Sequence, residues 1–352
     1  MDQNRLFLAI AISVAIMLGF QVLMPHPKTV PHLAAPANGP NETTLNQSPT
    51  PAPLGTPGGQ LAGTNAAASA AALAQVPRLK IVAPRVEGSM SLVGARLDYL
   101  VLRDYHETIK RTSPLVQLLE PLGQKKPYYI QYGWSAAPGT TTKLPGDDTR
   151  WTPSAPTLSP NSPVTLSWDN GAGVTFQIVL SVDNDYMFTA KQAVVNRSGA
   201  PVSVFPWARI RRDYTPVTLG YYLLHEGPLG VVKGTLQEMT YAKVKSAAKD
   251  HDGLAFQGSD DGGWAGITDK YWLTAVIPDQ ISPVTIAFRH LTQDGGDRYQ
   301  VDFVHDEAET VAPGAQAATT TRVFAGAKVV QLLDHYGAEY HIPGFWRAVD
   351  FG

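Results

Sequence analysis

The sequence predicts an all-β fold, a large antiparallel β-sandwich that is followed by a C-terminal helix. Short runs of alternating apolar and polar residues begin at Arg78, and turn residues separate them. No helical period of ten or more residues interrupts these runs before Ala327. Strands joined by turns pair antiparallel, whereas parallel sheets need helical crossovers. The number of strands favours one large sandwich over residues 78–326.

An apolar segment precedes the sandwich. Residues 6–24 carry no charge and reach the length of about 20 residues that a helix needs to cross a bilayer. We therefore predict one transmembrane α-helix within residues 1–24. Its apolar positions include Leu6, Ile10, Val14, Leu18 and Val22. A cleaved signal peptide is the alternative, but its apolar run is shorter and Met24-Pro25-His26-Pro27 is a poor cleavage site. Arg5 before the span favours a cytoplasmic N-terminus.

A linker is predicted between the apolar segment and the sandwich. Residues 25–77 are rich in Pro, Ala and Gly, and up to Val76 they carry only two charges, on Lys28 and Glu42. They show no apolar period, so no face can be buried to offset the entropy of ordering. We expect a disordered linker with a mean span on the order of 40 Å.

The strand pattern is clearest around Asn170-Gly171. The alternating runs 164–168 and 174–180 flank this pair, and Asn-Gly between two such runs is a strong hairpin signal. We expect at least one of Trp264 and Trp272 in the core, because both lie in the densest apolar stretch. The other main predicted strands lie at 79–82, 89–93, 96–102, 128–132, 186–195, 272–277, 284–290, 299–305 and 319–324.

The pattern changes at Ala327, and residues 327–352 are predicted to hold the C-terminal helix and an interfacial segment. The spacing i, i+3, i+4 and i+7 predicts one apolar helix face. The residues on this face are Val329, Leu332, Leu333 and Tyr336. Gly337 suits the end of the helix. The following residues, 342–352, are aromatic and apolar with one basic residue, Arg347. Such a segment suits a membrane interface or packing on the domain, and both readings stay open.

Composition excludes several classes of protein. The net charge is −2 and only 16% of the residues are charged, which argues against nucleic-acid binding. The chain has no cysteine, so it forms no disulfide and no Cys-ligated zinc site. This absence does not identify the compartment, because exported bacterial proteins do not require disulfides.

No motif predicts an enzyme. The stretch 227–234 is rich in glycine but lacks the Gly-Lys-Ser/Thr ending of a phosphate loop. Asp250-His251-Asp252 suits a solvated loop better than a metal site, and Asp260 to Gly263 suits a tight turn better than a calcium loop. His225-Glu226 and His305-Asp306 are the remaining candidates for acid–base pairs in a sugar cleft. We therefore predict no catalytic residues, no cofactor and no metal.

The order of the segments resembles a known family. After the anchor, the linker and the β domain, the chain reads Gly326-Ala327-Lys328, then 332–337 as Leu-Leu-Asp-His-Tyr-Gly, and finally 348–352 as Ala-Val-Asp-Phe-Gly. Within the domain, 262–267 reads Gly-Gly-Trp-Ala-Gly-Ile. The whole chain resembles, in order, the N-terminal half of the bacterial YidC-type membrane protein insertases of the YidC/Oxa/Alb family, with an alphaproteobacterial character.

The resemblance implies a location, a fold and partners. It implies an inner-membrane protein whose N-terminus is cytoplasmic and whose β domain is periplasmic, with a galactose-mutarotase-like supersandwich fold. The implied partners are nascent inner-membrane proteins, the Sec translocon and the lipid bilayer, without nucleotide or metal. Residues 327–352 then lead to a helical membrane core that this chain lacks, so no insertion residue can be transferred onto it.

Two other functions stay open. A membrane-anchored periplasmic carbohydrate-binding or carbohydrate-active sandwich would line one cleft with convergent histidines and carboxylates, and fold alone does not decide function. A purely structural periplasmic spacer or interaction module would need no such cleft.

Overall fold

The computed structural model describes residues 76–218 and 224–349. The predicted anchor residues Leu6, Ile10, Val14, Leu18 and Val22 lie outside these residues, as does the predicted linker up to residue 75. In the described ranges no helix combines the length and the apolar character needed to cross a bilayer.

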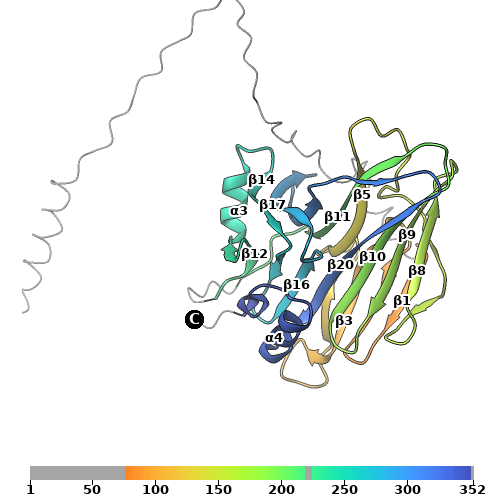
Figure 1. The fold of residues 1–352 in the computed structure, drawn as a ribbon. Helices are drawn as coiled ribbons and strands as arrows, with labels where there is room; N and C mark the ends of the chain where they lie inside the picture. The colour runs from red at the N-terminus through yellow and green to blue at the C-terminus, as the bar shows by residue number, and fades with distance from the viewer. Residues whose placement is uncertain (1–75, 219–223, 350–352) are drawn as a thin grey trace, which may run out of the picture. The chain divides into compact units, whose positions relative to one another are not determined.

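The described residues form two β-sheets and three short helices (Figure 1). The larger sheet contains β1 (Arg78–Val82), β2 (Val86–Ser91), β3 (Arg96–His106), β4 (Leu115–Leu119), β5 (Tyr128–Ala136), β7 (Thr157–Leu158), β11 (Val202–Arg212), β14 (Leu254–Asp261), β17 (Pro283–Gln293), β18 (Gly296–His305) and β19 (Glu309–Val311). The smaller sheet contains β6 (Thr152–Pro153), β8 (Val164–Asp169), β9 (Val174–Val182), β10 (Met187–Asn196), β12 (Gly227–Val232), β13 (Thr235–Glu238), β15 (Trp264–Thr268), β16 (Trp272–Ile277) and β20 (Gln316–Ala327). The helices are α3 (Tyr241–Ala248), α4 (Val330–Glu339) and the 3₁₀ helix η1 (Phe345–Ala348).

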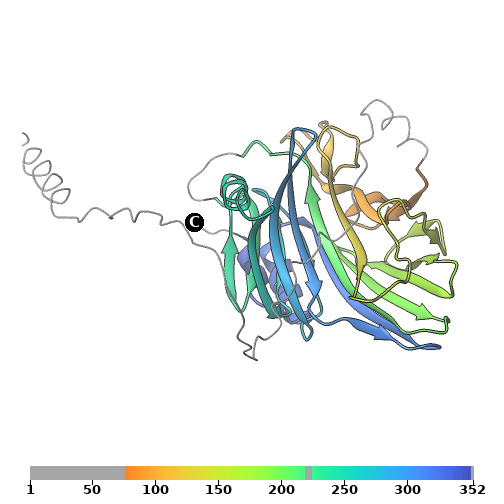
Figure 2. The ribbon, with the colours of Figure 1, turned by 90° about the horizontal axis from the view of Figure 1, so that it is seen from above.

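The two sheets form a sandwich. The larger has the order β14-β17-β18-β11-β5-β3-β2-β1-β7, with β4 on β3 and β19 on β11. The smaller has the order β13-β12-β15-β16-β20-β10-β9-β8-β6. Among the described strands, β1 with β7 is the single parallel pair. The sheets appear as two facing layers in Figure 2. The predicted all-β antiparallel sandwich is therefore confirmed.

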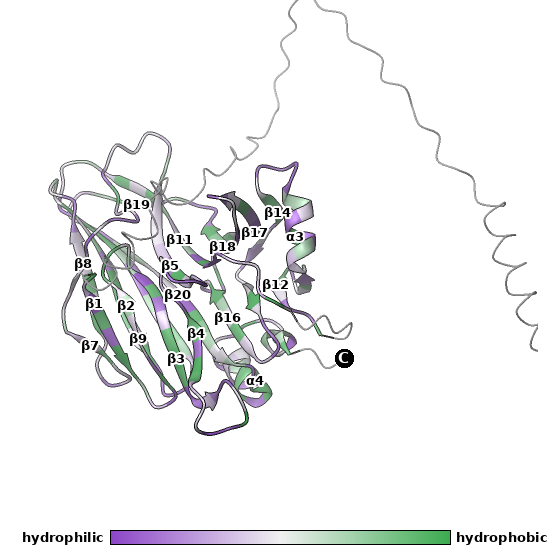
Figure 3. Ribbon diagram, turned by 180° about the vertical axis from the view of Figure 1, so that it is seen from behind, coloured by the Kyte–Doolittle hydropathy of each residue, from purple (hydrophilic) through white to green (hydrophobic). Residues whose placement is uncertain are grey.

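The core lies between the sheets because the strands alternate. Every second residue of β9 is buried, and these are Val174, Phe176, Ile178, Leu180 and Val182. The alternation of apolar and polar residues along the strands is visible in Figure 3. Across the layers, the ring of Trp134 in β5 meets that of Phe176 edge-on, with the centroids 5.1 Å apart. Alternation places one side of each strand in this shared core.

A polar link also crosses the core. Gln192 of β10 is fully buried, and its amide nitrogen donates to the Gly133 carbonyl of β5 at 2.8 Å. Its amide oxygen accepts from the Thr321 hydroxyl of β20 at 3.3 Å. A buried amide is tolerated only when such partners satisfy it, so this link helps to fix the position of one sheet on the other.

The predicted hairpin at Asn170-Gly171 is present between β8 and β9. Gly171 has φ +76°, a left-handed conformation that glycine adopts without strain. The side chains of Asp169 and Asn170 accept from the amides of Gly171 and Ala172, each at 2.8 Å. The turn is therefore held by the residues from which it was predicted.

Helix α3 was not predicted, because eight residues are too few for a periodicity search. Thr240 caps its N-terminus by accepting from the Lys243 amide at 3.3 Å. Tyr241, Val244 and Ala248 are its buried residues, and they lie on one side of the helix. The helix packs on β14 and β17.

The C-terminal helix differs from its prediction at both ends. Ala327 still pairs with Trp272 in the smaller sheet, and Val329 is extended at φ −85° and ψ 112°, so the helix begins at Val330. The helix also runs through Gly337 to Glu339. The chain reverses instead at His341, which has φ +57°. Gly337 therefore does not end the helix.

Candidate functional site

The end of the described chain packs back onto the sandwich. We call residues 328–349 the docked segment. The ring of Phe324 in β20 contacts Tyr336 of α4 at 6.0 Å and Phe345 of η1 at 5.7 Å between centroids. Phe345 also meets Trp264 of β15 edge-on at 5.2 Å. Leu333 and these four aromatic residues are almost fully buried, so the segment belongs to the core.

Hydrogen bonds orient the docked segment. The Tyr336 hydroxyl donates to the carboxylate of Asp183, and burial raises the pKa of that carboxyl. The indole nitrogen of Trp264 donates to the Pro343 carbonyl at 3.0 Å. The guanidinium of Arg322 lies 4.2 Å from the centre of the Tyr340 ring. These directional contacts select one placement among those that apolar burial alone would allow.

Two glycines explain why the local sequence fits this packing. A Cβ at Gly326 would lie 2.2 Å from the Tyr186 ring, so only glycine lets that ring pack over β20. Gly344 has φ +58° at the start of η1, where the chain turns to bring Phe345 into the core.

The predicted helix residues have unequal positions. Leu333 and Tyr336 are buried, Leu332 is partly buried against the core, and Val329 precedes the helix but also packs on the core. In the segment after the helix, Phe345 is buried with Ile342 and Ala348. The side chain of Trp346 is instead 44% exposed. The segment therefore packs on the domain and still presents one tryptophan to its surroundings.

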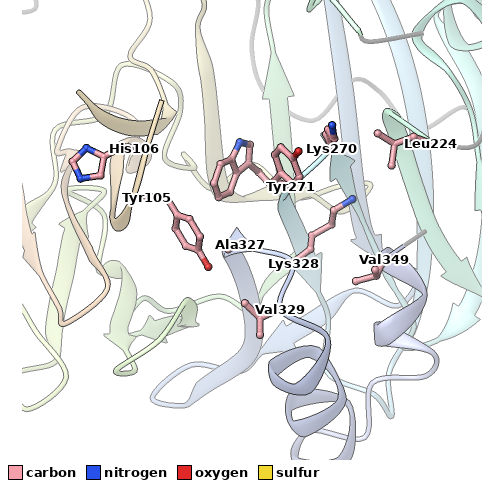
Figure 4. A pocket seen from close by; sticks show the side chains of 10 residues that line it. Tyr105, His106, Leu224, Lys270, Tyr271, Ala327, Lys328, Val329 and Val349 are labelled. Carbon is pink, nitrogen blue, oxygen red and sulfur yellow. The ribbon is translucent and has the colours of Figure 1, made fainter. Parts of the chain in front are cut away.

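A pocket of about 480 Å³ adjoins the docked segment (Figure 4). It lies where the end of β3, the turn between β15 and β16, and the end of β20 come together. Its lining residues are Tyr105, His106, Leu224, Lys270, Tyr271, Trp272, Ala327, Lys328, Val329 and Val349. The lining is mostly apolar and aromatic, with two lysines and a histidine.

Fixed contacts shape the pocket. Tyr105 meets Trp272 edge-on at 5.1 Å, and the ammonium of Lys270 lies 4.9 Å from the centre of the Tyr271 ring. The amide of Lys328 donates to the Tyr271 carbonyl at 2.9 Å. The ammonium of Lys328 donates to the Thr268 hydroxyl, also at 2.9 Å. The two lysines are thus carried by adjacent, paired backbone segments.

A buried ion pair anchors the turn that carries Lys270. Arg212 of β11 donates two hydrogen bonds of 2.7 Å to the carboxylate of Asp269, and one of 2.6 Å to the Tyr241 hydroxyl. Its guanidinium also lies 4.0 Å from the centre of the Tyr128 ring. Arg212 comes from the larger sheet and Asp269 from the turn that follows β15 of the smaller one, so this bidentate pair ties that turn to the other layer beside the pocket.

The outer side of the larger sheet carries a second cluster, which we call the charged face: Gln131, Asp147, Arg209, Arg289 and Asp302. Arg209 is 2% exposed and donates to Gln131 at 2.6 Å and to Asp147 at 3.0 Å. Arg289 donates to Asp302 at 3.2 Å. The sheet aligns the cluster, because Arg209 lies opposite Gln131 on one side and Asp302 on the other.

The candidates weighed for acid–base chemistry make contacts within the domain. His225 contacts the Pro228 carbonyl at 3.1 Å. Asp306 accepts from the Thr285 hydroxyl, and burial lowers the pKa of His305. Within the described ranges no three His, Asp or Glu side chains are grouped so that they could hold a metal ion.

The glycine-rich stretches have structural roles. Residues 227–232 form strand β12, so the expected turn is confined to Lys233 and Gly234. Gly262 and Gly263, at φ +108° and +78°, make the expected tight turn before Trp264.

Sequence reasoning missed the pocket residues. Lys270-Tyr271-Trp272 places a basic residue beside two aromatics, the composition of a membrane interface, and Lys328 adds a second charge. We predict an interfacial segment only within residues 342–352. The approach of Lys328 to Tyr271 depends on the pairing of β16 with β20. The contribution of Tyr105 depends on the contact of β3 in the other sheet with Trp272.

Comparison with known proteins decides the family. The family model described as the YidC periplasmic domain matches residues 78–352. The chain belongs to the YidC family. Its β-sandwich and docked segment are therefore the fold of a YidC periplasmic domain.

Curated relatives carry the same family name. The chain is 54% identical to the membrane protein insertase YidC of Granulibacter bethesdensis over 358 residues, which covers all of this chain and 59% of that protein. It is 56% identical to the insertase of Acidiphilium cryptum over 284 residues, covering 78% of this chain and 47% of that one. It is 39% identical to the insertase of Methylorubrum extorquens over 368 residues, which covers all of this chain and 59% of that protein. The chain thus spans about half to three-fifths of the length of these relatives.

Solved structures show more distant likenesses. A galactose mutarotase related enzyme from Lactobacillus acidophilus aligns with a TM-score of 0.46 and 9% identity, covering 70% of this chain and 97% of that one. A galactose mutarotase-like protein from Lactobacillus casei aligns with a TM-score of 0.43 and 10% identity, covering 70% and 99%.

Proposed function

We propose that this chain provides the periplasmic part of a membrane protein insertase, and that this part supports insertion rather than carrying it out. The observation that supports the proposal is the docked segment. The chain that leaves the smaller sheet at Ala327 is packed against the sandwich again as far as Ala348. The sandwich therefore fixes where the polypeptide leaves the domain.

The supportive role follows from the free-energy cost of insertion. Moving a polar segment into hydrocarbon is costly, because unpaired backbone and charged groups lose their hydrogen bonds to water. That cost must be lowered within the bilayer, and a sandwich outside the bilayer cannot do so. A rigid domain can instead hold a neighbouring membrane core in one orientation. In this proposal Phe324, Tyr336 and Phe345 transmit that orientation.

The proposed partners follow from the family. Nascent inner-membrane proteins are the substrates of the whole insertase, and the lipid bilayer is their destination. The Sec translocon is a proposed partner of the surface of the sandwich. The proposed topology places the segment 1–24 in the inner membrane with a cytoplasmic N-terminus and the sandwich in the periplasm.

We propose no catalytic activity and no cofactor for the sandwich. The sequence supports this, because it carries no paired-carboxylate signature and no Ser-His-Asp order. Turnover of a sugar by this protein, abolished by replacing His225 or Glu226, would favour the carbohydrate reading instead.

A complementation experiment tests the supportive role. The chain is joined to the remaining part of the Granulibacter bethesdensis insertase and expressed in a strain depleted of its own insertase. We expect the chimera to restore growth and the 352-residue chain alone to fail. Growth on the chain alone, or insertion of a model substrate by it in liposomes, contradicts the proposal.

A matched pair of variants tests the docked segment in the same chimera. Phe345→Asp places a charge in the aromatic core and is expected to reduce growth. Ile109→Asp makes the same kind of change at a fully exposed position and is expected to have no effect. If both variants grow like the unmodified chimera, docking has no part in the function. Immunoblots of both variants show whether the protein still accumulates.

A further inference from the structure

We propose that the domain rests on the bilayer surface through Tyr271 and Trp346, with both rings at the level of the lipid headgroups. We call these two residues, together with Arg347, the exit rim, because they adjoin the end of the described chain at Val349. The inference rests on the proposed function, which places a membrane core after this point. It adds which surface of the domain faces the lipid and which side chains make the contact.

The exit rim lies at one end of the sandwich. Tyr271 and Val349 line the same pocket, so the turn between β15 and β16 adjoins the end of the described chain (Figure 4). The amide of Val349 donates to the Trp346 carbonyl at 3.0 Å, which keeps Trp346 at the same end. In the proposed topology the polypeptide continues from here into the membrane core. This end of the domain is then the one nearest to the bilayer.

The rim presents the most exposed aromatic side chains of residues 76–218 and 224–349. Tyr271 is 58% exposed and Trp346 is 44% exposed, and Tyr99 follows at 38%. Tyrosine and tryptophan rings are most favourable where one side is apolar and the other is wet. The headgroup region of a bilayer offers this environment, and both residue types are enriched there.

The fold holds Tyr271 in place before any contact with lipid. The turn that carries it is fixed by the two bonds of 2.7 Å from Arg212 to Asp269. The Lys328 amide also donates to the Tyr271 carbonyl at 2.9 Å. The ring itself contacts that of Trp272, with 6.0 Å between the centroids. Because the ring is already ordered, contact with a surface costs little conformational entropy.

Trp346 is held in a similar way. It belongs to η1, in which Phe345 and Ala348 are buried in the domain. The guanidinium of Arg347 lies 5.7 Å from the centre of the Trp346 ring and donates to the Gly234 carbonyl at 3.3 Å. The rim therefore carries a positive charge beside an exposed ring. Such a charge is attracted to the anionic lipids of a bilayer.

The size of the rim favours a bilayer over a protein partner. Aromatic residues and arginine are also enriched in protein interfaces, but a stable interface buries about 800 Å² on each partner. The two partly exposed rings of the rim supply roughly 200 Å². A bilayer needs no such continuous patch, because the proposed membrane core already holds the domain beside it. Two rings are then enough to fix which side of the domain faces the lipid.

The experiment uses the full 352-residue chain in vesicles of equal parts phosphatidylcholine and phosphatidylglycerol with brominated acyl chains. Bromine quenches nearby tryptophans. No tryptophan precedes Trp134 in the sequence, so the fluorescence reports only on the β domain and the docked segment. Trp346 is exposed, whereas the other six tryptophans are buried or partly buried. We expect quenching relative to unbrominated vesicles, and loss of most of it in Trp346→Phe.

The position of the bromine tests the depth of the rim. Bromine close to the glycerol is expected to quench more strongly than bromine near the methyl end of the chain, because the headgroup level lies close to the glycerol. Stronger quenching by the deep bromine would place Trp346 in the hydrocarbon and overturn the proposed contact.

A matched pair of tyrosine variants tests the second ring. Tyr271→Ser is expected to remove about half of the quenching, because one of the two rings in contact is lost. Tyr99→Ser removes an exposed tyrosine from β3, six residues before Tyr105 of the pocket, and is expected to leave the quenching unchanged. Circular dichroism melts show whether both variants fold.

Three further results overturn the proposal. Absence of quenching in the unmodified chain would leave the rim to a protein partner or to water. Quenching that Trp346→Phe leaves intact would mean that another face touches the bilayer. Equal quenching in Tyr271→Ser and Tyr99→Ser would remove Tyr271 from the contact. The growth test measures no lipid contact, so the proposed function and the exit rim can fail independently.

Discussion

The docked segment and the charged face of the larger sheet are both buried, but different forces hold them. The docked segment is held mainly by the rings of Phe324, Tyr336 and Phe345 around Trp264. The charged face is held by hydrogen bonds that Arg209 makes to its neighbours. Apolar burial is stabilising in itself, whereas buried charges stabilise only when each finds its partner.

The difference indicates what each region contributes. Truncating a ring in the docked segment removes contacts and leaves a cavity, and the loss should depend little on pH or salt. Removing one member of the charged face instead leaves a partner without its counter-charge. The docked segment is therefore expected to carry stability, and the charged face to fix the loop that bears Asp147 against the sheet.

The largest expected effect is at Trp264 of β15, the ring against which the docked segment packs. Trp264→Ala should lower the free energy of unfolding by about 3–5 kcal/mol, because the residue is fully buried and also donates to Pro343. Denaturant melts of the full chain measure this change. Trp346→Ala, at an exposed position, is the control and should stay within about 0.5 kcal/mol. Similar losses for both variants would show that the segment is not packed as described.

A slightly smaller effect is expected on the charged face. Arg209→Ala should cost about 3 kcal/mol, at the low end for breaking a buried pair, because Asp147 is 13% exposed and water can reach it. Arg197→Ala removes an exposed arginine and should be nearly neutral. A loss below about 1 kcal/mol for Arg209→Ala would place the charged face with ordinary surface ion pairs.

A hydroxyl deletion tests the polar contribution within the docked segment. Tyr336→Phe keeps the ring but removes the donor to Asp183, and it should cost about 1–2 kcal/mol near neutral pH. Burial already raises the pKa of Asp183, and losing this donor raises it further. The deficit should therefore shrink as the pH falls through the folded-state pKa. A deficit that is the same at every pH would mean that Asp183 is not the acceptor.

The smallest expected effect concerns His305, whose pKa is shifted by burial. Burial lowers the pKa of His305, so the unfolded chain binds a proton at a higher pH than the folded protein does. The contribution of His305 to the free energy of unfolding is therefore fully present above pH 6.5, the usual pKa of histidine. It falls as the pH drops below that value. His305→Phe should flatten the pH dependence of the melting temperature on the acid side of neutrality. An unchanged slope would exclude His305 as its source.

The sequence predicted the features that depend on local patterns. The alternation of apolar and polar residues predicted β9 and β10, and the helical period predicted α4. The pair Asn170-Gly171 predicted the hairpin between β8 and β9. The apolar density around Trp264 correctly indicated a core position. Each of these signals lies within about ten residues and reflects burial on one face.

The features that were missed depend on contacts between distant strands. Alternation places Arg209 on the outer side of β11, where solvent is the usual neighbour, yet the residue is 2% exposed and pairs with Asp147 from a distant loop. The pocket likewise needs Tyr105, Lys270 and Lys328 together, from three separate segments. Val329, which was expected on the helix face, instead precedes α4, because pairing with β16 extends β20 to Ala327.

Hydrogen–deuterium exchange of the full chain tests the central claim most directly, namely that the docked segment is part of the fold of the sandwich. Amides that exchange only by global unfolding define the most stable core. We expect the amides of Leu333 and Tyr340 to exchange as slowly as those of β20, and Phe345→Asp to accelerate them selectively. Exchange of these amides at the rate of an open loop, with β20 still protected, would contradict this claim.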